Sequence, residues 1–292
     1  MSPEAPTQWN VLALLNWTKA HLERAGVPSP RLAAEMLLAH AMGCRRIDLY
    51  TRFDYLPTPE QLAGFRESIR RAAERQPVAY LVGEKEFYSL RIKVTPDVLV
   101  PRPETEILVA QAVEHLRSLG RPGCLWDVCT GSGCVALAVA SQVADAQALA
   151  TDCSPAAVAV AAANAAELKL AERVRTRVAD LLKLPEDCAD LKDFDVITAN
   201  PPYIPDAAPV AEEVKHEPAI ALRGGRDGLD VIRVIVRDAP ALLRPGGALI
   251  MEYGYDQAPA VRELVAANGA FAEPKILRDH QSIERAVMAI RK

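Results

Sequence analysis

The tetrapeptide Asn200-Pro201-Pro202-Tyr203 combines an amide side chain, two prolines and an aromatic ring. It follows the apolar segment 194–198, which we expect to be a strand, and ligands of open α/β sheets bind where strands end. Each proline restricts its own φ and pushes the preceding residue to extended geometry. The resulting rigid edge offers the Asn200 side chain and a backbone carbonyl to the hydrogens of a planar –NH2 group. Tyr203 can stack against that group.

Such an edge suits methylation of an amide or exocyclic amine. The nitrogen of these groups is a weak nucleophile because its lone pair is delocalised. Hydrogen bonds to both N–H groups orient the nitrogen and stabilise the charge that grows on it, and alignment with a methyl sulfonium permits in-line transfer. No general base is needed before attack, since the proton can leave afterwards. The alternative is a plain polyproline turn.

A second candidate site is the loop 127–133, which runs from Asp127 through Thr130 and Gly131 to Gly133. The glycines permit a tight turn and close approach of a ligand, and the N–H groups at a helix start favour polar or anionic groups. Asp152 lies 21 residues after Gly131 and can accept both ribose hydroxyls of a nucleoside. The pattern predicts a nucleoside-containing cofactor, but it also fits the loose dinucleotide fingerprint, so NAD stays open.

Two acidic residues near this loop have structural alternatives. Asp152 could instead be an N-cap ahead of Ser154-Pro155. Asp180 follows the expected strand 174–178 and could bond an adenine amino group, or it could be a solvated acid at the end of a strand.

The elements that must position these residues alternate along the C-terminal part of the chain. This βαβ pattern predicts a parallel sheet with helices on both faces. We expect helices over 104–119, 135–143, 156–168 and 229–243, strands over 124–128, 146–151, 174–178, 194–198 and 248–252, and a final helix–strand pair ending in 285–290.

The N-terminal part is predicted to be a small helical bundle. Apolar stripes indicate three helices, over about 9–26, 31–40 and 59–75, the last two begun by Ser29-Pro30 and Thr58-Pro59 as N-caps with Pro at the first position. Segments 86–94 and 98–100 are strand-like. The expected domains are therefore a bundle over 1–76, a hairpin linker over 77–100 and an α/β domain over 101–292.

Composition excludes several classes of protein. The 292 residues carry a net charge of −4, which argues against a globally basic nucleic-acid binder. The charge is uneven, with 14 basic and 11 acidic residues up to Arg102 and 20 basic and 27 acidic after it. No apolar stretch is long enough for a membrane span. The N-terminus shows no secretory pattern, and the six scattered cysteines fit reduced thiols, so we expect a cytoplasmic protein. The five histidines show no metal spacing, and no metal is expected.

These motifs together resemble a known family. The loop 127–133, Asp152 and the Asn200 tetrapeptide resemble class I S-adenosylmethionine methyltransferases that act on planar nitrogens. The blocks QPVAYLVG (76–83), VPRPETE (100–106) and GGRDGLD (224–230), with Phe87-Tyr88, resemble the release-factor glutamine N5-methyltransferases, the PrmC/HemK family. The resemblance runs over nearly the whole chain and implies a Rossmann-like methyltransferase sheet behind a helical N-terminal domain.

The resemblance implies methyl transfer from S-adenosyl-L-methionine to the glutamine of the Gly-Gly-Gln loop in class I peptide-chain release factors. It implies that the cofactor is held by Asp127, Thr130, Gly131, Gly133, Asp152, Asp180 and Asn200. It assigns catalysis to Asn200, the Pro201 carbonyl and Tyr203, which bind the substrate amide with Pro202. Phe87 and the turn from Arg102 to Glu104 are expected to wall the active site.

The chain departs from the family pattern at Cys129, where glycine is usual. A positive φ there would cost a cysteine about 1–2 kcal/mol, so we expect the loop to stay in an allowed region. Sister enzymes that methylate a ribosomal-protein glutamine can also carry Cys there. Their upstream turn reads Pro-Arg-Ser-Pro, whereas this chain has Pro101-Arg102-Pro103-Glu104, which favours the release factor.

Other functions remain as alternatives. A DNA or RNA amino-methyltransferase would want a phosphate-binding surface, and the acidic C-terminal part does not predict one. Arginines at 45, 46, 66, 70, 71 and 75 could form a basic face, or a solvated helix face interleaved with glutamates. An NAD-dependent dehydrogenase would leave the Asn200 tetrapeptide unused, and a non-catalytic release-factor binder would not need it. We expect a monomer with no nucleic-acid requirement and no membrane.

Overall fold

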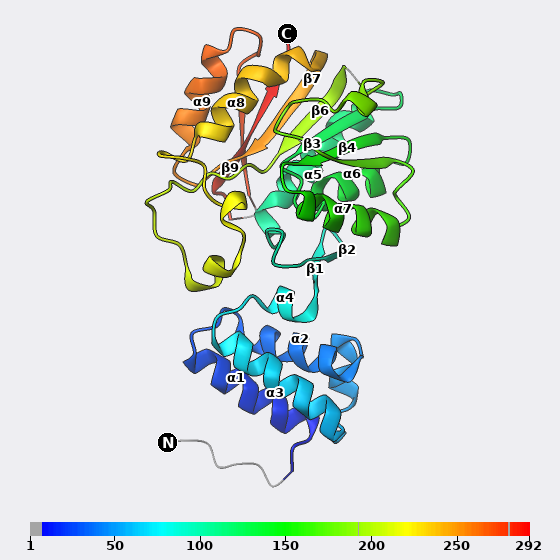
Figure 1. Ribbon diagram of the computed structural model, residues 1–292, viewed down its shortest axis with the longest axis vertical. Helices are drawn as coiled ribbons and strands as arrows, with labels where there is room; N and C mark the ends of the chain where they lie inside the picture. The colour runs from blue at the N-terminus through cyan, green and yellow to red at the C-terminus, as the bar shows by residue number, and fades with distance from the viewer. Residues whose placement is uncertain (1–7, 192, 280) are drawn as a thin grey trace. The chain divides into compact units, whose positions relative to one another are not determined.

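The computed structural model describes residues 8–191, 193–279 and 281–292. The N-terminal segment in which no secretory pattern was expected lies mostly outside these ranges. The chain divides into two compact units, one of residues 1–84 with 210–216 and one of residues 85–209 with 217–292 (Figure 1). Within the described residues, no helix is both long and apolar enough to cross a membrane.

The first unit is helical, as predicted. Its main helices are α1 (Val11–Arg24), α2 (Pro30–Met42) and α3 (Pro59–Ala73), and it also has the short η1 (Arg46–Thr51) and α4 (Val78–Val82), which were not predicted. A capping box begins α3, because Thr58 and Gln61 each accept the other's backbone N–H. Ser29 precedes α2 but is not the predicted side-chain cap. Its φ of +48° is left-handed, and its hydroxyl makes no capping bond.

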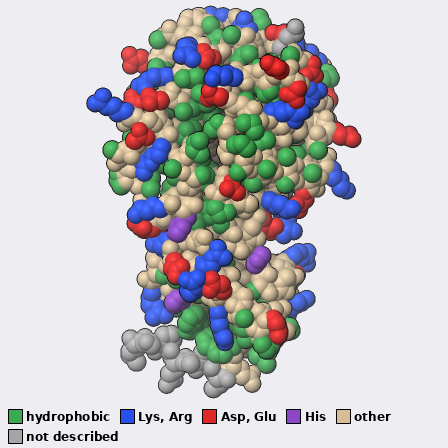
Figure 2. Space-filling view, in the orientation of Figure 1, with side chains coloured by type: hydrophobic (Ala, Val, Ile, Leu, Met, Phe, Trp, Pro, Cys, Tyr) green, Lys and Arg blue, Asp and Glu red, His purple; other side chains and the backbone are tan. Residues whose placement is uncertain are grey.

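The arginines of this unit are largely matched by nearby carboxylates. Arg70 pairs with Glu67 and Glu74, at 2.7 and 2.6 Å, and Arg75 pairs with Glu213 at 2.7 Å. Figure 2 shows acidic and basic side chains next to one another on the visible face of the unit. This arrangement favours a solvated, locally neutralised helix surface over a phosphate-binding face.

A hairpin follows the helices, but it is shorter than predicted. It consists of β1 (Glu84–Phe87) and β2 (Leu90–Lys93), and residues 98–100 are not a strand. Tyr88 and Ser89 connect the strands with φ of +48° and +62°. Two positive φ values are typical of the tight hairpin turn that matches the twist of the strands.

The second unit is built on a seven-stranded sheet of order β5-β4-β3-β6-β7-β9-β8. The neighbours β5, β4, β3, β6 and β7 pair in parallel, in that order. Helices cover both faces of the sheet, as predicted (Figure 1). The strands are β3 (Cys124–Val128), β4 (Gln147–Asp152), β5 (Val174–Val178), β6 (Phe194–Ala199), β7 (Leu243–Glu252), β8 (Lys275–Arg278) and β9 (Glu284–Ile290). The helices are α5 (Glu106–Ser118), preceded by η2 (Pro103–Thr105), then α6 (Cys134–Gln142), α7 (Pro155–Glu167), α8 (Asp230–Asp238) and α9 (Ala258–Ala267).

The sheet departs from the predicted parallel arrangement only at one edge. Strand β9 runs antiparallel to both β7 and β8, and β8 was not predicted. The link 279–283 between β8 and β9 is too short for a helical crossover, so these neighbours must be antiparallel. The helix predicted over 229–243 ends as an α-helix at Asp238 and is followed by the short 3-10 helix η6 (Ala239–Ala241), because Pro240 lacks the N–H that a further α-helical turn would use.

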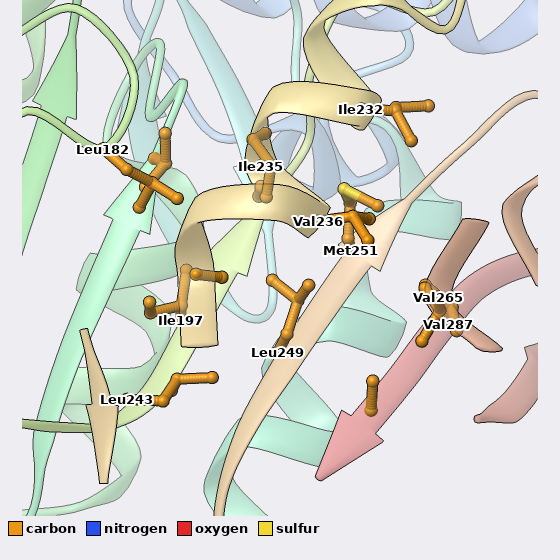
Figure 3. Packing of buried hydrophobic residues seen from close by; sticks show 14 of the residues in the cluster. Leu182, Ile197, Ile232, Ile235, Val236, Leu243, Leu249, Met251, Val265 and Val287 are labelled. Carbon is orange, nitrogen blue, oxygen red and sulfur yellow. The ribbon is translucent and has the colours of Figure 1, made fainter. Parts of the chain in front are cut away.

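The core between α8 and the sheet holds the central strands in place. Ile232, Ile235 and Val236 are buried on one face of α8 at helical spacing. Figure 3 shows this face over Ile197 of β6 and Leu249 of β7. The packing aligns the carboxyl ends of β6 and β7, where the candidate site lies.

Candidate functional site

A cavity of about 240 Å³ opens at the carboxyl ends of β3, β4 and β6. Eight of the predicted site residues line it: Arg102, Asp127, Thr130, Gly131, Asp152, Asp180, Asn200 and Pro202. The other five, Phe87, Glu104, Gly133, Pro201 and Tyr203, are not among the described residues that line it. The cavity therefore joins the glycine loop to the Asn-Pro-Pro-Tyr edge, which lie about 70 residues apart in the sequence.

The glycine loop turns tightly at two positions. Gly131 and Gly133 have φ of +54° and +81°. The N–H of Gly131 donates to Asp152 Oδ2 at 3.0 Å, which joins the loop to the end of β4. Gly133 is not among the described residues that line this cavity; it is the N-cap of α6, and a Cβ there would lie 3.1 Å from Ala161 Cβ of α7. Its small size serves helix packing.

Cys129 does not behave as expected. Its φ is +57°, so the loop enters the left-handed region at the position where the family usually has glycine. The expectation of an ordinary conformation was therefore wrong. Because the loop must turn from the end of β3 toward the start of α6, the backbone conformation is kept and the cysteine bears its cost.

Asp127 is a buried carboxylate at the wall of the cavity. Its oxygens accept the hydroxyls of Thr130 and Thr198, at 2.5 and 2.7 Å. Removal from water raises the pKa of Asp127 to about 6, and the two hydroxyl bonds act in the opposite direction. Asp127 is thus mainly ionised at pH 7 and gives the cavity a negative charge.

Asp152 is held by backbone groups rather than acting as a helix cap. Its Oδ1 accepts the N–H of Ser154 at 3.0 Å, while Oδ2 accepts that of Gly131. The N-cap of α7 is Ser154, whose hydroxyl accepts from Ala157 N. Asp180 differs, since its side chain is 64% exposed and pairs with Lys183 at 2.6 Å.

Acidic groups dominate the charge of the cavity. Its lining includes the carboxylates of Asp97, Asp127, Asp152 and Asp180 and the guanidinium groups of Arg102 and Arg223. Both guanidinium groups are already engaged. Arg102 pairs with the buried Glu217, and Arg223 donates to the carbonyls of Pro205 and Ala208. The remaining field favours a cationic ligand.

The Asn-Pro-Pro-Tyr edge is held from behind by buried polar groups. Asn200 Nδ2 donates to Thr105 Oγ1 at 3.2 Å, and Thr105 Oγ1 donates to Glu252 Oε2 at 2.7 Å. Tyr203 Oη donates to Glu252 Oε1 at 3.4 Å. Burial raises the pKa of Glu252 to about 7 and keeps that of Tyr203 well above its usual value. Tyr203 thus stays a neutral donor.

Two glycines of the block 224–230 lie against the backbone of this edge. A Cβ on Gly224 would come within 2.4 Å of the Pro202 carbonyl oxygen, and one on Gly228 within 2.1 Å of that of Tyr203. Gln257 Nε2 donates to the same Tyr203 oxygen at 3.0 Å. This block, noted in the sequence only by resemblance, therefore supports the tetrapeptide physically.

Arg102 and its neighbours form another wall. Glu217, 6% exposed, accepts from Arg102 and from the N–H of Val100 at 3.1 Å. Phe87 of β1 is 2% exposed and Glu104 is half-buried, and neither is among the described residues that line the cavity.

Polar residues of the site that were not predicted include Asp97 and Arg223, which line the cavity, and Thr105, Glu217 and Glu252. Glu252 carried a usable signal, because a glutamate that ends the apolar run 248–251 is placed by its strand at the carboxyl edge of the sheet. Thr105 and Glu217 lie in irregular segments, and no periodicity marks them. No group of three or more His, Cys, Asp or Glu side chains suited to a metal ion occurs in the described ranges.

The fold and the cavity define a methyltransferase of the Rossmann-like class. Residues 125–287 match a methyltransferase domain family, which implies a methyl donor of the S-adenosylmethionine type. A methyltransferase structure from Pyrococcus furiosus aligns with a TM-score of 0.51 at 17% identity, covering 80% of this chain and 99% of that one. It shows the likeness of fold.

Longer matches define the particular family. Residues 13–83 match the PrmC N-terminal domain. The chain is 42% identical to the release factor glutamine methyltransferase of Rhodopirellula baltica, over 96% of this chain and 95% of that protein. It is 40% identical to the one from Geobacter sulfurreducens, over 97% and 98%. The chain belongs to the release factor glutamine methyltransferase family.

Proposed function

We propose that this protein transfers a methyl group from S-adenosyl-L-methionine to the side-chain amide nitrogen of the glutamine in the Gly-Gly-Gln loop of class I peptide-chain release factors. Family membership supports the reaction and the substrate. The observation that carries the assignment to this site is the Asn200 amide, which lines the same cavity as Asp152 and the glycine loop.

The residues of the cavity fit this cofactor. A carboxylate can accept about four hydrogen bonds, and the backbone uses one at each oxygen of Asp152, so capacity remains for ribose hydroxyls. Asp127 and the other acidic groups attract a cationic sulfonium, and Thr130 and Gly131 line the same wall. We assign Asp180 to the adenine end. Bound there, the cofactor supplies an electrophilic methyl group.

The Asn-Pro-Pro-Tyr edge would bind the substrate amide. The Asn200 side-chain oxygen and the Pro201 carbonyl oxygen would each accept a hydrogen bond from one N–H of the substrate amide. These two bonds would orient the nitrogen and stabilise the positive charge that grows on it during attack. The nitrogen would gain the methyl group as the sulfur–methyl bond of the cofactor breaks, and would then lose one proton to solvent, so no base is needed beforehand. Pro202 and Tyr203 border this position. Arg102 lines the same cavity, whereas Phe87 and Glu104 are not among the described residues that line it.

The rival reactions are less well supported. A DNA or RNA amino-methyltransferase would have to bring a phosphate chain to a mouth lined by four aspartates. A dehydrogenase would leave the polar support behind Asn200 without a task. We therefore propose a protein substrate, with no nucleic-acid requirement, and a monomer that works in the cytoplasm.

One labelling experiment tests the assignment. Purified release factor, ribosomal proteins and DNA are each incubated with the protein and methyl-labelled S-adenosylmethionine. We expect label on the Gly-Gly-Gln glutamine alone, located by mass spectrometry. Label on a ribosomal protein, or on nucleic acid only, would show that the release factor is not the substrate. Asn200→Ala should lose at least about a hundredfold in rate, and full methylation by this variant would overturn the mechanism.

A further inference from the structure

Thr105 and Glu252 meet next to Asn200, although they come from different elements, and Thr105 also lines the cavity. Thr105 ends η2 and Glu252 ends β7, and each is 1% exposed. Burying an ionisable carboxylate costs free energy, and its hydrogen bonds to two hydroxyl groups offset part of that cost. Such a group therefore raises the question of what it does at this position.

Counting hydrogens shows what the pair does to Asn200. When Glu252 is ionised, the Thr105 hydroxyl gives its one hydrogen to Glu252 Oε2 at 2.7 Å, because a carboxylate can only accept. Only lone pairs of Thr105 then face Asn200, so the group at 3.2 Å must be the donor Nδ2. A flipped amide would set its oxygen against another oxygen that has no hydrogen to offer. The Asn200 oxygen is thereby directed away from Thr105.

The other oxygen of Glu252 holds the far end of the same edge. Oε1 accepts from Tyr203 Oη at 3.4 Å. One carboxylate thus anchors Asn200, through Thr105, and Tyr203 directly. The two residues that border the proposed amide site are therefore both linked to Glu252 by hydrogen bonds.

We propose that Thr105 and Glu252 are positioning residues that hold the Asn200 amide with its oxygen toward the substrate –NH2 group. This inference rests on the proposed function. In the flipped amide, the N–H groups of Asn200 Nδ2 would face the N–H groups of the substrate amide. The attractive hydrogen bond that stabilises the growing positive charge would then be replaced by repulsion between donors.

The test compares Thr105→Val, which keeps the shape and removes the hydroxyl, with Thr105→Ser, which keeps the hydroxyl. With release factor as substrate, we expect kcat to fall about tenfold to a hundredfold in the valine variant, with KM changed less than about threefold, and serine to restore most of the loss. Binding of S-adenosylhomocysteine, measured by calorimetry, should stay within about threefold in both.

A matched control separates positioning from loss of a buried hydroxyl. Thr151 is also 1% exposed, in β4, and its Oγ1 accepts from Trp126 Nε1 at 2.8 Å. Thr151→Val should lower thermal stability but leave kcat near wild type. A kcat of Thr105→Val near wild type, or serine and valine variants with the same loss, would overturn the inference.

A second measurement needs no substrate. The side-chain amide protons of Asn200, assigned in NMR spectra by their loss in Asn200→Asp, should exchange with water faster in Thr105→Val than in wild type. Equal exchange rates would overturn the inference by themselves. If wild-type protein fails to label release factor, the proposed function fails, and this exchange measurement still decides whether Thr105 holds Asn200.

Discussion

Gly228 packs so closely on Tyr203 that a Cβ atom at Gly228 would lie 2.1 Å from the Tyr203 carbonyl oxygen. The same Cβ would lie 2.7 Å from Gln257 Nε2, which donates to that oxygen. The φ of Gly228 is +78°, which a side chain also disfavours. The absence of a side chain at one position therefore allows two backbone segments to meet at the edge of the site.

Gly228→Ala is expected to destabilise the protein strongly. Left-handed strain costs about 1–2 kcal/mol and the clash about 1–3 kcal/mol more. Gly246→Ala is the matched control, because Gly246 has φ of +79° and nothing within 4 Å of its Cβ position. It should lose only the strain term. Urea unfolding measures both, and equal losses would contradict the role assigned to the Tyr203 contact.

Glu252→Gln should change how stability depends on pH. Burial raises the pKa of Glu252 to about 7 from its ordinary 4.5, so the folded protein holds this proton more tightly than the unfolded chain. The resulting stabilisation is complete below pH 4.5 and is lost as the pH rises through 7, by about 3 kcal/mol. A glutamine side chain does not bind or release a proton in this pH range, so it adds no pH-dependent stabilisation.

The measurement is the free energy of unfolding of both proteins between pH 5 and pH 8. Wild type should weaken relative to Glu252→Gln across this range. The comparison removes the contribution of Asp127, whose raised pKa is present in both proteins. A constant difference between the two would show that Glu252 keeps one protonation state throughout.

Replacement of Cys129 should show the strain in the glycine loop. Its φ of +57° favours glycine, so Cys129→Gly should be more stable than Cys129→Ala by about 1 kcal/mol, as alanine keeps the Cβ that causes the strain. Both variants lose the thiol, and their difference isolates the backbone. Chemical denaturation measures it, and an alanine variant at least as stable as the glycine one would refute the strain.

The two aspartates assigned to the cofactor should differ in importance. Asp152 is held by two backbone N–H groups at the cavity wall, whereas Asp180 is exposed and paired with Lys183. Asp152→Ala should weaken S-adenosylhomocysteine binding about tenfold to a hundredfold, and Asp180→Ala about threefold. Calorimetric titration of each variant, with the same fraction of folded protein in each sample, measures the two losses of affinity. A larger loss in Asp180→Ala would reverse the assignment.

Much of the fold was predictable because it depends on local periodicity. The alternation of apolar strands and helices indicated the order of elements and the sheet class, and Thr58-Pro59 marked the start of α3 correctly. The edge strands were less predictable. The pairing of β9 between β7 and β8 is a non-local choice that no pattern within β9 specifies.

The candidate site divides in the same way. Asn200, Asp152 and Gly131 could be named from the sequence because each ends a strand or begins a helix, and parallel strands bring such ends to one edge. Thr105 and Glu217 could not, since each acts through a partner more than 100 residues away. The conformation of Cys129 was also beyond the sequence, because the loop's ends, and not the residue itself, determine its φ.

The sequence by itself determined which groups could do chemistry. These are an amide beside two prolines, a glycine turn, and an aspartate at the spacing from that turn expected of a residue that binds ribose. Only the tertiary structure decided how those groups are held. A side chain's type specifies which hydrogens it can give or take. The direction in which Asn200 presents its oxygen depends on Thr105 and Glu252, which meet only when the sheet has formed.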